Sequence, residues 1–185
     1  MDPSCKPETI FTIGHSTHPI EAFIFILKAF AIATLVDIRT IPRSRHNPQF
    51  SGEALAPALK SAGVDYRYMK ALGGLRRADR DSPNDGWRNA SFRGYADYMR
   101  TPAFQAAVDE LVALGKASRC AIMCAEAVPW RCHRSLVGDA LLVRHMTVED
   151  IMSAKKSNPH TLTKFARVEG TQILYPAPAA DAIAG

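Results

Sequence analysis

A short apolar run at Cys120–Ala125 constrains the fold of this chain more than any other sequence feature. The run reads C-A-I-M-C-A, follows Arg119 and precedes Glu126, and contains no charged position. A run of this length without polar alternation is typical of a strand that is buried on both faces, as in a parallel sheet covered by helices. The sequence therefore predicts a buried strand, followed by a loop that Pro129 interrupts and by a helix.

Short strands alternate with helical patterns along most of the chain. Strands are predicted at residues 10–13, 33–38, 64–69, 120–125, 146–151 and 172–175. Helices are predicted at residues 19–30, 51–62, 94–99, 101–115 and 136–143, with Ser16 or Thr17 capping the first and Ser51 the second. This alternation predicts one α/β domain over residues 9–176, a three-layer α/β/α arrangement with a mainly parallel sheet of about five strands. Residues 1–8 and 177–185 are expected to be flexible.

Two stretches without apolar periodicity are predicted to be ordinary loops. Residues 40–50 contain two prolines and the side chains Arg43, Arg45 and His46, which would face solvent or ligand. Residues 155–160 are polar and are also expected to form a loop.

The stretch from Ala71 to Phe92 carries turn residues throughout. An irregular segment of this length is usually a lid, a binding loop or a disordered region. We expect a lid on the substrate side of the fold, partly ordered because Leu75 and Trp87 can pack against the body of the domain.

The cysteines are not expected to form a disulfide framework. The chain has 185 residues and four cysteines, at positions 5, 120, 124 and 132. A domain of this length buries roughly 70 % of the surface of its unfolded chain, so it needs neither disulfides nor a structural metal. No apolar stretch approaches the roughly 20 residues of a membrane span, and the first residues lack a secretory signal pattern. We therefore expect a cytoplasmic protein with free thiols and no membrane partner.

Reactive side chains follow the first, second and fourth strands of the predicted sheet. They are His15, Ser16, Asp37, Arg39, Cys124, Glu126, Cys132 and His133. In an open parallel sheet, ligands bind beyond the carboxyl ends of the strands, where a following helix offers unpaired N–H groups. These are more reactive groups than stability requires, so a functional site is predicted at this edge.

The cysteines at this edge are the candidate nucleophiles. Cys132 stands beside His133 and between two arginines, all of which favour its thiolate, and Cys124 is the alternative if it is the exposed thiol. A histidine would act as the base, oriented by a carboxylate. The candidate catalytic residues are Cys124, Cys132, His133, Glu126, His15 and Asp37.

The positive charge of the chain is regional. Between Arg39 and Arg93 there are eleven Lys or Arg and five Asp or Glu, so this region carries +6 while the whole chain carries +5. Such a region predicts an anionic partner, either a phosphorylated small molecule or a nucleic acid. Aromatic side chains of the region could stack on bases: Tyr66, Tyr68, Trp87, Phe92 and Tyr95. The candidate substrate-binding residues are Ser16, Arg39, Arg43, Arg45, Arg131, Arg134, Gly73, Gly74 and Tyr95.

Three other interpretations of the same residues are open. The cysteines could be small buried hydrophobes, and the basic face could serve only solubility. The protein could be a non-catalytic nucleic-acid-binding module whose basic loops contact phosphates. Cys124, Cys132 and His133 could form a metal site with a carboxylate, although their spacing differs from that of common zinc motifs and adjacent residues rarely bind one ion. We expect neither a metal nor another cofactor.

Several short motifs together resemble one known family. They are T-I-G-H-S at 12–16, V-D-I-R at 36–39, P-R-S at 42–44, L-G-G at 72–74, F-R-G-Y-A-D-Y-M at 92–99, C-A-E at 124–126, C-H-R-S-L at 132–136 and F-A-R-V-E-G at 165–170. In this order they are similar to the domain of unknown function 488 family. The resemblance implies an α/β fold and a shared site, and it implies no reaction.

A looser resemblance concerns the strand that ends in Cys124 and the basic loop after it. A cysteine at a strand end, followed by a basic loop that enters a helix, is similar to rhodaneses and cysteine phosphatases. Those families place an arginine after five intervening residues, whereas six residues without a glycine separate Cys124 from Arg131. Close backbone approach to an anion usually needs glycine, so this likeness implies an analogous site only.

Overall fold

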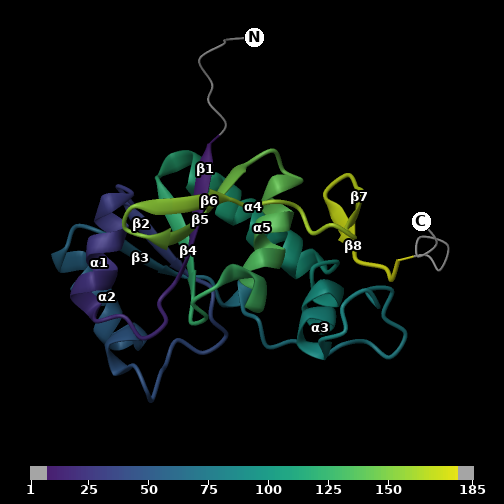
Figure 1. Cartoon of the computed structure of the whole chain (residues 1–185), viewed down its shortest axis with the longest axis horizontal. Helices are drawn as coiled ribbons and strands as arrows, with labels where there is room; N and C mark the ends of the chain where they lie inside the picture. The colour runs from purple at the N-terminus through teal and green to yellow at the C-terminus, as the bar shows by residue number, and fades with distance from the viewer. Residues whose placement is uncertain (1–7, 179–185) are drawn as a thin grey trace, which may run out of the picture.

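A mostly parallel six-stranded sheet forms the centre of the molecule (Figure 1). The structure is a computed structural model and describes residues 8–178. The strands are β1 (Thr9–Gly14), β2 (Thr34–Asp37), β3 (Asp65–Tyr68), β4 (Cys120–Cys124), β5 (Thr147–Ser153) and β6 (Lys156–Pro159). Their order in the sheet is β3-β2-β4-β1-β5-β6, with β6 antiparallel to β5 and the other neighbours parallel. The predicted α/β class and mainly parallel sheet are confirmed.

Helices cover both faces of the sheet (Figure 1). They are α1 (Ile20–Ala29), α2 (Gly52–Ser61), α3 (Ala90–Tyr98), α4 (Pro102–Ala117) and α5 (Arg134–Leu142). Helices α1 and α2 pack on one face, and α3, α4 and α5 pack on the other. The side chains of β4 show why both layers are needed, because Ile122 belongs to the core under α4 and α5 whereas Ala121 and Met123 belong to the core under α1 and α2.

The strand order brings together the strand ends at which the functional site was predicted. Strand β4 lies between β1 and β2, so that Gly14 of β1 and Asp37 of β2 are in register with Cys124 and Met123 of β4. Because all three strands are parallel, their carboxyl ends meet at one edge of the sheet. The predicted convergence of the first, second and fourth strands is confirmed.

Several element predictions were wrong near the carboxyl end of the chain. Residues 155–160, predicted as loop, contain β6, whose polar sequence is compatible with an exposed edge strand. The predicted last strand exists as β8 (Gln172–Leu174), but it pairs with β7 (Arg167–Glu169) in a separate two-stranded sheet and not with the main sheet.

Helix boundaries also differ from those predicted. Helix α4 does not end at Gly115 but continues to Ala117. Gly115 lies within the helix and packs against Ile10. The predicted cap Ser51 donates its hydroxyl to the carbonyl of Pro48 and makes no capping hydrogen bond. Helix α1 likewise begins after Pro19 without a side-chain cap. Helix α3 begins at Ala90, before the predicted residue 94, and its cap is the carboxamide of Asn89.

Within the stretch predicted to be a lid, residues 73–89 are irregular but are held against α3. Asp97 of α3 is buried, and its carboxylate accepts hydrogen bonds from the backbone N–H of Asp79, the hydroxyl of Ser82 and the amide of Asn84. Trp87 stacks against Phe92 and contacts the aromatic rings near the carboxyl end of the domain. Of the two residues expected to order this stretch, Trp87 packs on the core, whereas Leu75 is 73 % exposed.

The predicted flexible ends lie almost wholly outside the described residues, which exclude 1–7 and 179–185. Within residues 8–178, none of the helices combines the length and the apolar character that a membrane crossing requires.

Candidate functional site

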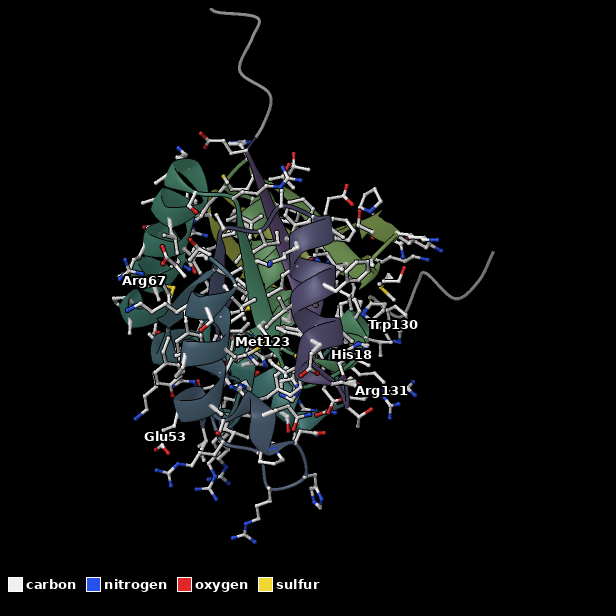
Figure 2. All side chains as sticks on the ribbon, turned by 90° about the vertical axis from the view of Figure 1, so that its left-hand side faces the viewer. His18, Glu53, Arg67, Met123, Trp130 and Arg131 are labelled. Atoms are coloured by element: carbon white, nitrogen blue, oxygen red, sulfur yellow. The ribbon has the colours of Figure 1, made fainter. Side chains whose placement is uncertain are left out.

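A cavity of about 480 Å³ opens at the carboxyl edge of β1, β2 and β4. We call it the thiol cavity. Nine of the residues predicted from the sequence line it: His15, Arg39, Arg43, Gly74, Cys124, Glu126, Arg131, Cys132 and His133. In Figure 2, Met123, the residue of β4 that precedes Cys124, lies near the centre of the view, and the side chains of His18 and Arg131 lie to its right.

The two sulfurs and one imidazole nitrogen form the centre of the site. Nδ1 of His133 lies 3.6 Å from Sγ of Cys132 and 3.9 Å from Sγ of Cys124. Cys124 ends β4, whereas Cys132 and His133 immediately precede α5. The thiols therefore meet because the connection between β4 and α5 folds back over the strand end.

The ring of His133 is held in one orientation by its surroundings. Its Nε2 lies 3.1 Å from the carbonyl oxygen of Ile38, which can only accept a hydrogen bond. Nε2 therefore carries the hydrogen, and in the neutral ring Nδ1 offers its lone pair to the thiols. The ring of Tyr95 packs against the imidazole at 4.9 Å between centroids. A Cβ atom on Gly74 would come within 2.3 Å of Nδ1, so the glycine allows the ring this position.

The environment makes Cys124 the more acidic of the two thiols at the edge. A hydrogen bond from the Cys132 thiol lowers the pKa of Cys124, and His133 and the backbone N–H of Glu126 lower it further, outweighing the effect of burial. Donating to that thiolate, together with burial, raises the pKa of Cys132. By contrast, burial alone raises the pKa of Cys120 to about 12. Of the two adjacent thiols, Cys124 is therefore the one whose ionisation is favoured.

His15 is held differently from His133. Its Nδ1 lies 2.8 Å from the carbonyl oxygen of Ser16, to which it donates, so Nε2 is left to accept from Arg39 Nη1 at 3.3 Å. Burial is the main reason that the pKa of His15 is lowered, and the ring stacks on Phe50 with centroids 4.2 Å apart. His15 is therefore a neutral ring whose lone pair is occupied by Arg39.

Asp37 lies behind Arg39 and does not line the thiol cavity. Its fully buried carboxylate accepts two hydrogen bonds from the guanidinium of Arg39, at 2.9 Å from Nε and 2.5 Å from Nη2, and one from the hydroxyl of Tyr66 at 2.7 Å. A bidentate pair of this kind fixes the plane of the guanidinium. Asp37 thus orients an arginine, whereas the sequence suggested that it would orient a histidine.

Arg134 supports the loop above the cavity. It is buried, and its guanidinium donates to the carbonyl oxygens of Glu126 and Ala127 at 3.1 and 3.3 Å. Its backbone N–H points to Sγ of Cys132 at 3.4 Å. The carbonyl of Glu126 lies so close to β1 that a Cβ atom on Gly14 would come within 1.8 Å of it. The predicted anion contact Arg134 is therefore a loop-holding residue, while the side chain of Glu126 is exposed.

Four other residues predicted to contact substrate do not line the thiol cavity. Tyr95 is fully buried and donates its hydroxyl to the carbonyl of Leu72. Gly73 is buried against Thr40, and Ser16 lies in the turn after β1 with a positive φ of 46°. Arg45 is exposed and lines a neighbouring cavity instead.

Sequence reasoning missed several residues of the thiol cavity, chiefly Ile41, Leu75 and Asn89. They lie in loops without periodic patterns, and the motifs next to them, P-R-S at 42–44, L-G-G at 72–74 and F-R-G-Y-A-D-Y-M at 92–99, were the nearby sequence signals. The carbonyl of Ile38, which orients His133, carries no sequence signal at all because every residue has a carbonyl.

Three side chains of this site could hold a metal ion. The ligand atoms of Cys124, Cys132 and His133 all lie within 4.8 Å of one another, which the spacing of these residues in the sequence did not predict. The two sulfur to nitrogen distances, 3.6 and 3.9 Å, resemble the edge of roughly 3.6 Å in a tetrahedral zinc site. Arg39 and Arg131 also line the cavity, and their charges oppose a divalent cation while favouring an anion.

Comparison with known proteins gives one finding. The model of the family described as Domain of unknown function DUF488 matches residues 19–141, which is more than half of the chain and includes the residues from Arg39 to His133 that line the thiol cavity. No curated protein and no solved structure matches the chain.

Proposed function

Because this chain belongs to the DUF488 family, whose name assigns no activity, we propose its function from the site itself. The proposed function is that of a thiol-dependent enzyme, in which Cys124 attacks an anionic substrate at the carboxyl edge of the sheet. The observation that carries it is the orientation of His133, whose Nδ1 faces both sulfurs while its Nε2 is bound to the carbonyl of Ile38. A histidine fixed in this way can accept a thiol proton and return it later.

The proposed reaction uses the two cysteines in different roles. The proton of Cys124 passes to Nδ1 of His133, and the Cys132 thiol donates a hydrogen bond to the thiolate. A bond then forms between the Cys124 sulfur and an electrophilic centre of the substrate as the bond from that centre to the leaving group breaks. The leaving group takes the proton from His133. Transfer of the bound group to water or another acceptor completes turnover and restores the thiol.

Positive charge in the lining of the thiol cavity supports an anionic substrate. Arg39 is fixed by Asp37, and its Nη1, which lies 3.3 Å from Nε2 of His15, has one N–H left with which to meet an anion without further ordering. Arg43 and Arg131 lie on the same lining and are exposed. These charges also stabilise the thiolate before substrate arrives.

Alkylation of individual cysteines tests the proposal without a known substrate. The rate of reaction with iodoacetamide would be measured across pH by mass spectrometry, in protein whose Cys5 is replaced by serine. We expect Cys124 to react well below the ordinary thiol pKa of about 8.5, and His133→Phe to slow this reaction at neutral pH. Cys120 is the internal control, because it does not line the thiol cavity and its pKa is raised to about 12.

Two results would refute the thiol mechanism. One is a Cys124 that reacts only above the ordinary thiol pKa, at the same rate in wild type and His133→Phe protein. The other is protection of Cys124 and Cys132 that disappears when a chelator removes bound metal, because a thiolate coordinated by metal is not a free nucleophile.

The alternative function is a non-catalytic nucleic-acid-binding module. The exposed side chains of Arg43, Arg45 and His46 on one loop favour it. Affinity for a nucleic acid should then fall steeply with salt, and replacement of Cys124 by serine should leave that affinity unchanged.

A further inference from the structure

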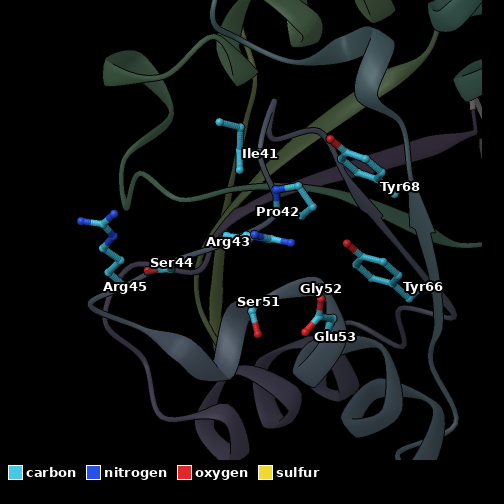
Figure 3. A pocket seen from close by; sticks show the side chains of 10 residues that line it. All are labelled: Ile41, Pro42, Arg43, Ser44, Arg45, Ser51, Gly52, Glu53, Tyr66 and Tyr68. Carbon is cyan, nitrogen blue, oxygen red and sulfur yellow. The ribbon is translucent and has the colours of Figure 1, made fainter.

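A second cavity adjoins the thiol cavity and takes no part in the proposed chemistry (Figure 3). Its volume is about 1030 Å³, and it lies between the loop 41–45, the start of α2 and the strand β3. We call it the tyrosine cavity. The two cavities share the lining residues Ile41, Arg43 and Ser44. A ligand that reaches Cys124 can therefore extend along this loop into the tyrosine cavity.

Two tyrosine rings form one wall of the tyrosine cavity (Figure 3). Tyr66 and Tyr68 are two positions apart on the edge strand β3, so their side chains lie on the same face of the sheet. The hydroxyl of Tyr66 donates to Asp37, and that of Tyr68 donates to the carbonyl of Thr40, each at 2.7 Å. Both hydroxyl groups are thereby satisfied, and the rings are held in place before any ligand binds. Such rings stack on a planar ligand at little entropic cost.

Exposed apolar surface is concentrated around these two cavities. The described residues include six large hydrophobic side chains that are exposed, and three of them line the cavities: Ile41, Tyr68 and Leu75. Tyr68 is 40 % exposed and Ile41 is 59 % exposed. Clustered exposed apolar side chains beside a polar site are typical of a ligand-binding surface.

A free positive charge stands opposite the tyrosines. In Figure 3 the guanidinium of Arg43 points toward Tyr66, whereas the side chain of Arg45 points away from the cavity. None of the ion pairs within residues 8–178 involves Arg43, so its guanidinium is available to an anionic group. Glu53, on the floor below Tyr66, offers a carboxylate that accepts hydrogen bonds.

We propose that the tyrosine cavity binds the nucleoside phosphate portion of the substrate. The base stacks on Tyr66 and Tyr68, the phosphate binds Arg43, and sugar hydroxyls donate to Glu53. Arg43 lies on both cavities, so a phosphate bound there places the group attached to it at the entrance to the thiol cavity, toward Cys124. Only this last step rests on the proposed thiol chemistry; the binding of the nucleoside phosphate stands without it.

Calorimetric titration of the full chain tests the binding. The probes are the four ribonucleoside 5′-monophosphates, the corresponding nucleosides, and a single DNA strand of about 12 nucleotides with and without a 5′-phosphate. We expect at least one monophosphate or the strand to bind, and to bind more tightly than the probe that lacks the phosphate. A free nucleotide and a strand end present the same chemistry, and the probe that binds identifies which of them the site takes.

Five variants connect the binding to the named residues. Tyr68→Ala should weaken binding about 10-fold or more, because stacking of a base on an aromatic ring is lost, whereas Tyr68→Phe should change it little. Arg43→Ala should weaken binding of the monophosphate about 10-fold without affecting the nucleoside. Arg45→Ala removes the same charge from the same loop but points away from the cavity, so its effect should be much smaller. Arg67→Ala, on the opposite face of β3, controls for general loss of charge.

The proposal is overturned if none of the probes binds, or if binding is insensitive to both Tyr68→Ala and Arg43→Ala in protein that retains wild-type thermal stability. These outcomes are independent of the thiol mechanism. Nucleotide binding together with an unreactive Cys124 would support the tyrosine cavity and refute the thiol enzyme, and a reactive Cys124 without nucleotide binding would do the reverse.

Discussion

Replacing His160 by glutamine should remove a contribution to stability that depends on pH. The imidazole lies between two buried carboxylates, with Nε2 3.1 Å from Asp139 Oδ1 and Nδ1 3.0 Å from Asp150 Oδ2. Asp139 also accepts a hydrogen bond from the hydroxyl of Tyr175, and Asp150 accepts one from Thr12. Both ring nitrogens can donate only when the ring is protonated, so the folded state favours the imidazolium.

The size of the effect follows from the change in the pKa of His160. Burial lowers this pKa, but hydrogen bonds to Asp139 and Asp150 outweigh burial and raise it from 6.5 to about 9. Each unit of pKa corresponds to about 1.4 kcal/mol, so the contribution to the free energy of unfolding is about 3 kcal/mol. The side chain is only 7 % exposed, so solvent screens the pair little. Because the pKa is raised on folding, the contribution is complete below pH 6.5 and is lost as the pH rises through about 9.

Urea unfolding at about pH 6 and about pH 9.5 measures this contribution. The loss of unfolding free energy in His160→Gln, relative to wild type, should be about 3 kcal/mol larger at the lower pH. Other groups that titrate in this range cancel when the variant is compared with wild type at each pH. His46→Gln is the matched control, because His46 is exposed. An equal loss at both pH values would show that the imidazolium does not stabilise the fold.

Two further predictions concern the edge of the sheet. Gly74→Ala should displace His133, because the new Cβ atom would come within 2.3 Å of Nδ1, and should slow the alkylation of Cys124 about 10-fold or more at neutral pH; an unchanged rate would mean that His133 does not assist the thiol. Asp37→Asn should lower the free energy of unfolding by about 3 kcal/mol, because it leaves the buried guanidinium of Arg39 without its ion pair; unfolding in urea that matches wild type would contradict this.

Much of the fold was predictable because local patterns and long-range packing agree. The apolar run ending at Cys124 is buried in the middle of a parallel sheet, and the helices from Ile20 and Pro102 lie near their predicted positions. Strand β6 was missed because an exposed edge strand needs no apolar pattern, and its pairing with β5 stabilises it from one side only. Strand β8 was assigned to the main sheet because a strand pattern does not specify its partner, and β7, with which it pairs, was not predicted.

The sequence predicted many of the residues that form the site, but much less of what each residue does there. Cys124, Cys132 and His133 were placed at one edge by the order of parallel strands, and they do lie within 4.8 Å of one another. The sequence favoured Cys132 as nucleophile because of its neighbours along the chain. In the structure the surroundings lower the pKa of Cys124 and raise that of Cys132, so proximity in space reverses the order of acidity that proximity in sequence suggested.

By itself, the sequence determined an α/β domain whose reactive side chains meet where parallel strands end. Apolar periodicity is a local rule, and the right-handed connection of parallel strands is a rule of topology. Both determine the fold without reference to the details of side-chain packing. Only the tertiary structure decided that His133 turns its Nδ1 toward the thiols, that Asp37 serves Arg39, and that Tyr66 and Tyr68 line a cavity next to the site. Those outcomes depend on a backbone carbonyl at Ile38, on buried hydrogen bonds and on the way loops cover the sheet edge, and a one-dimensional pattern encodes none of these contacts.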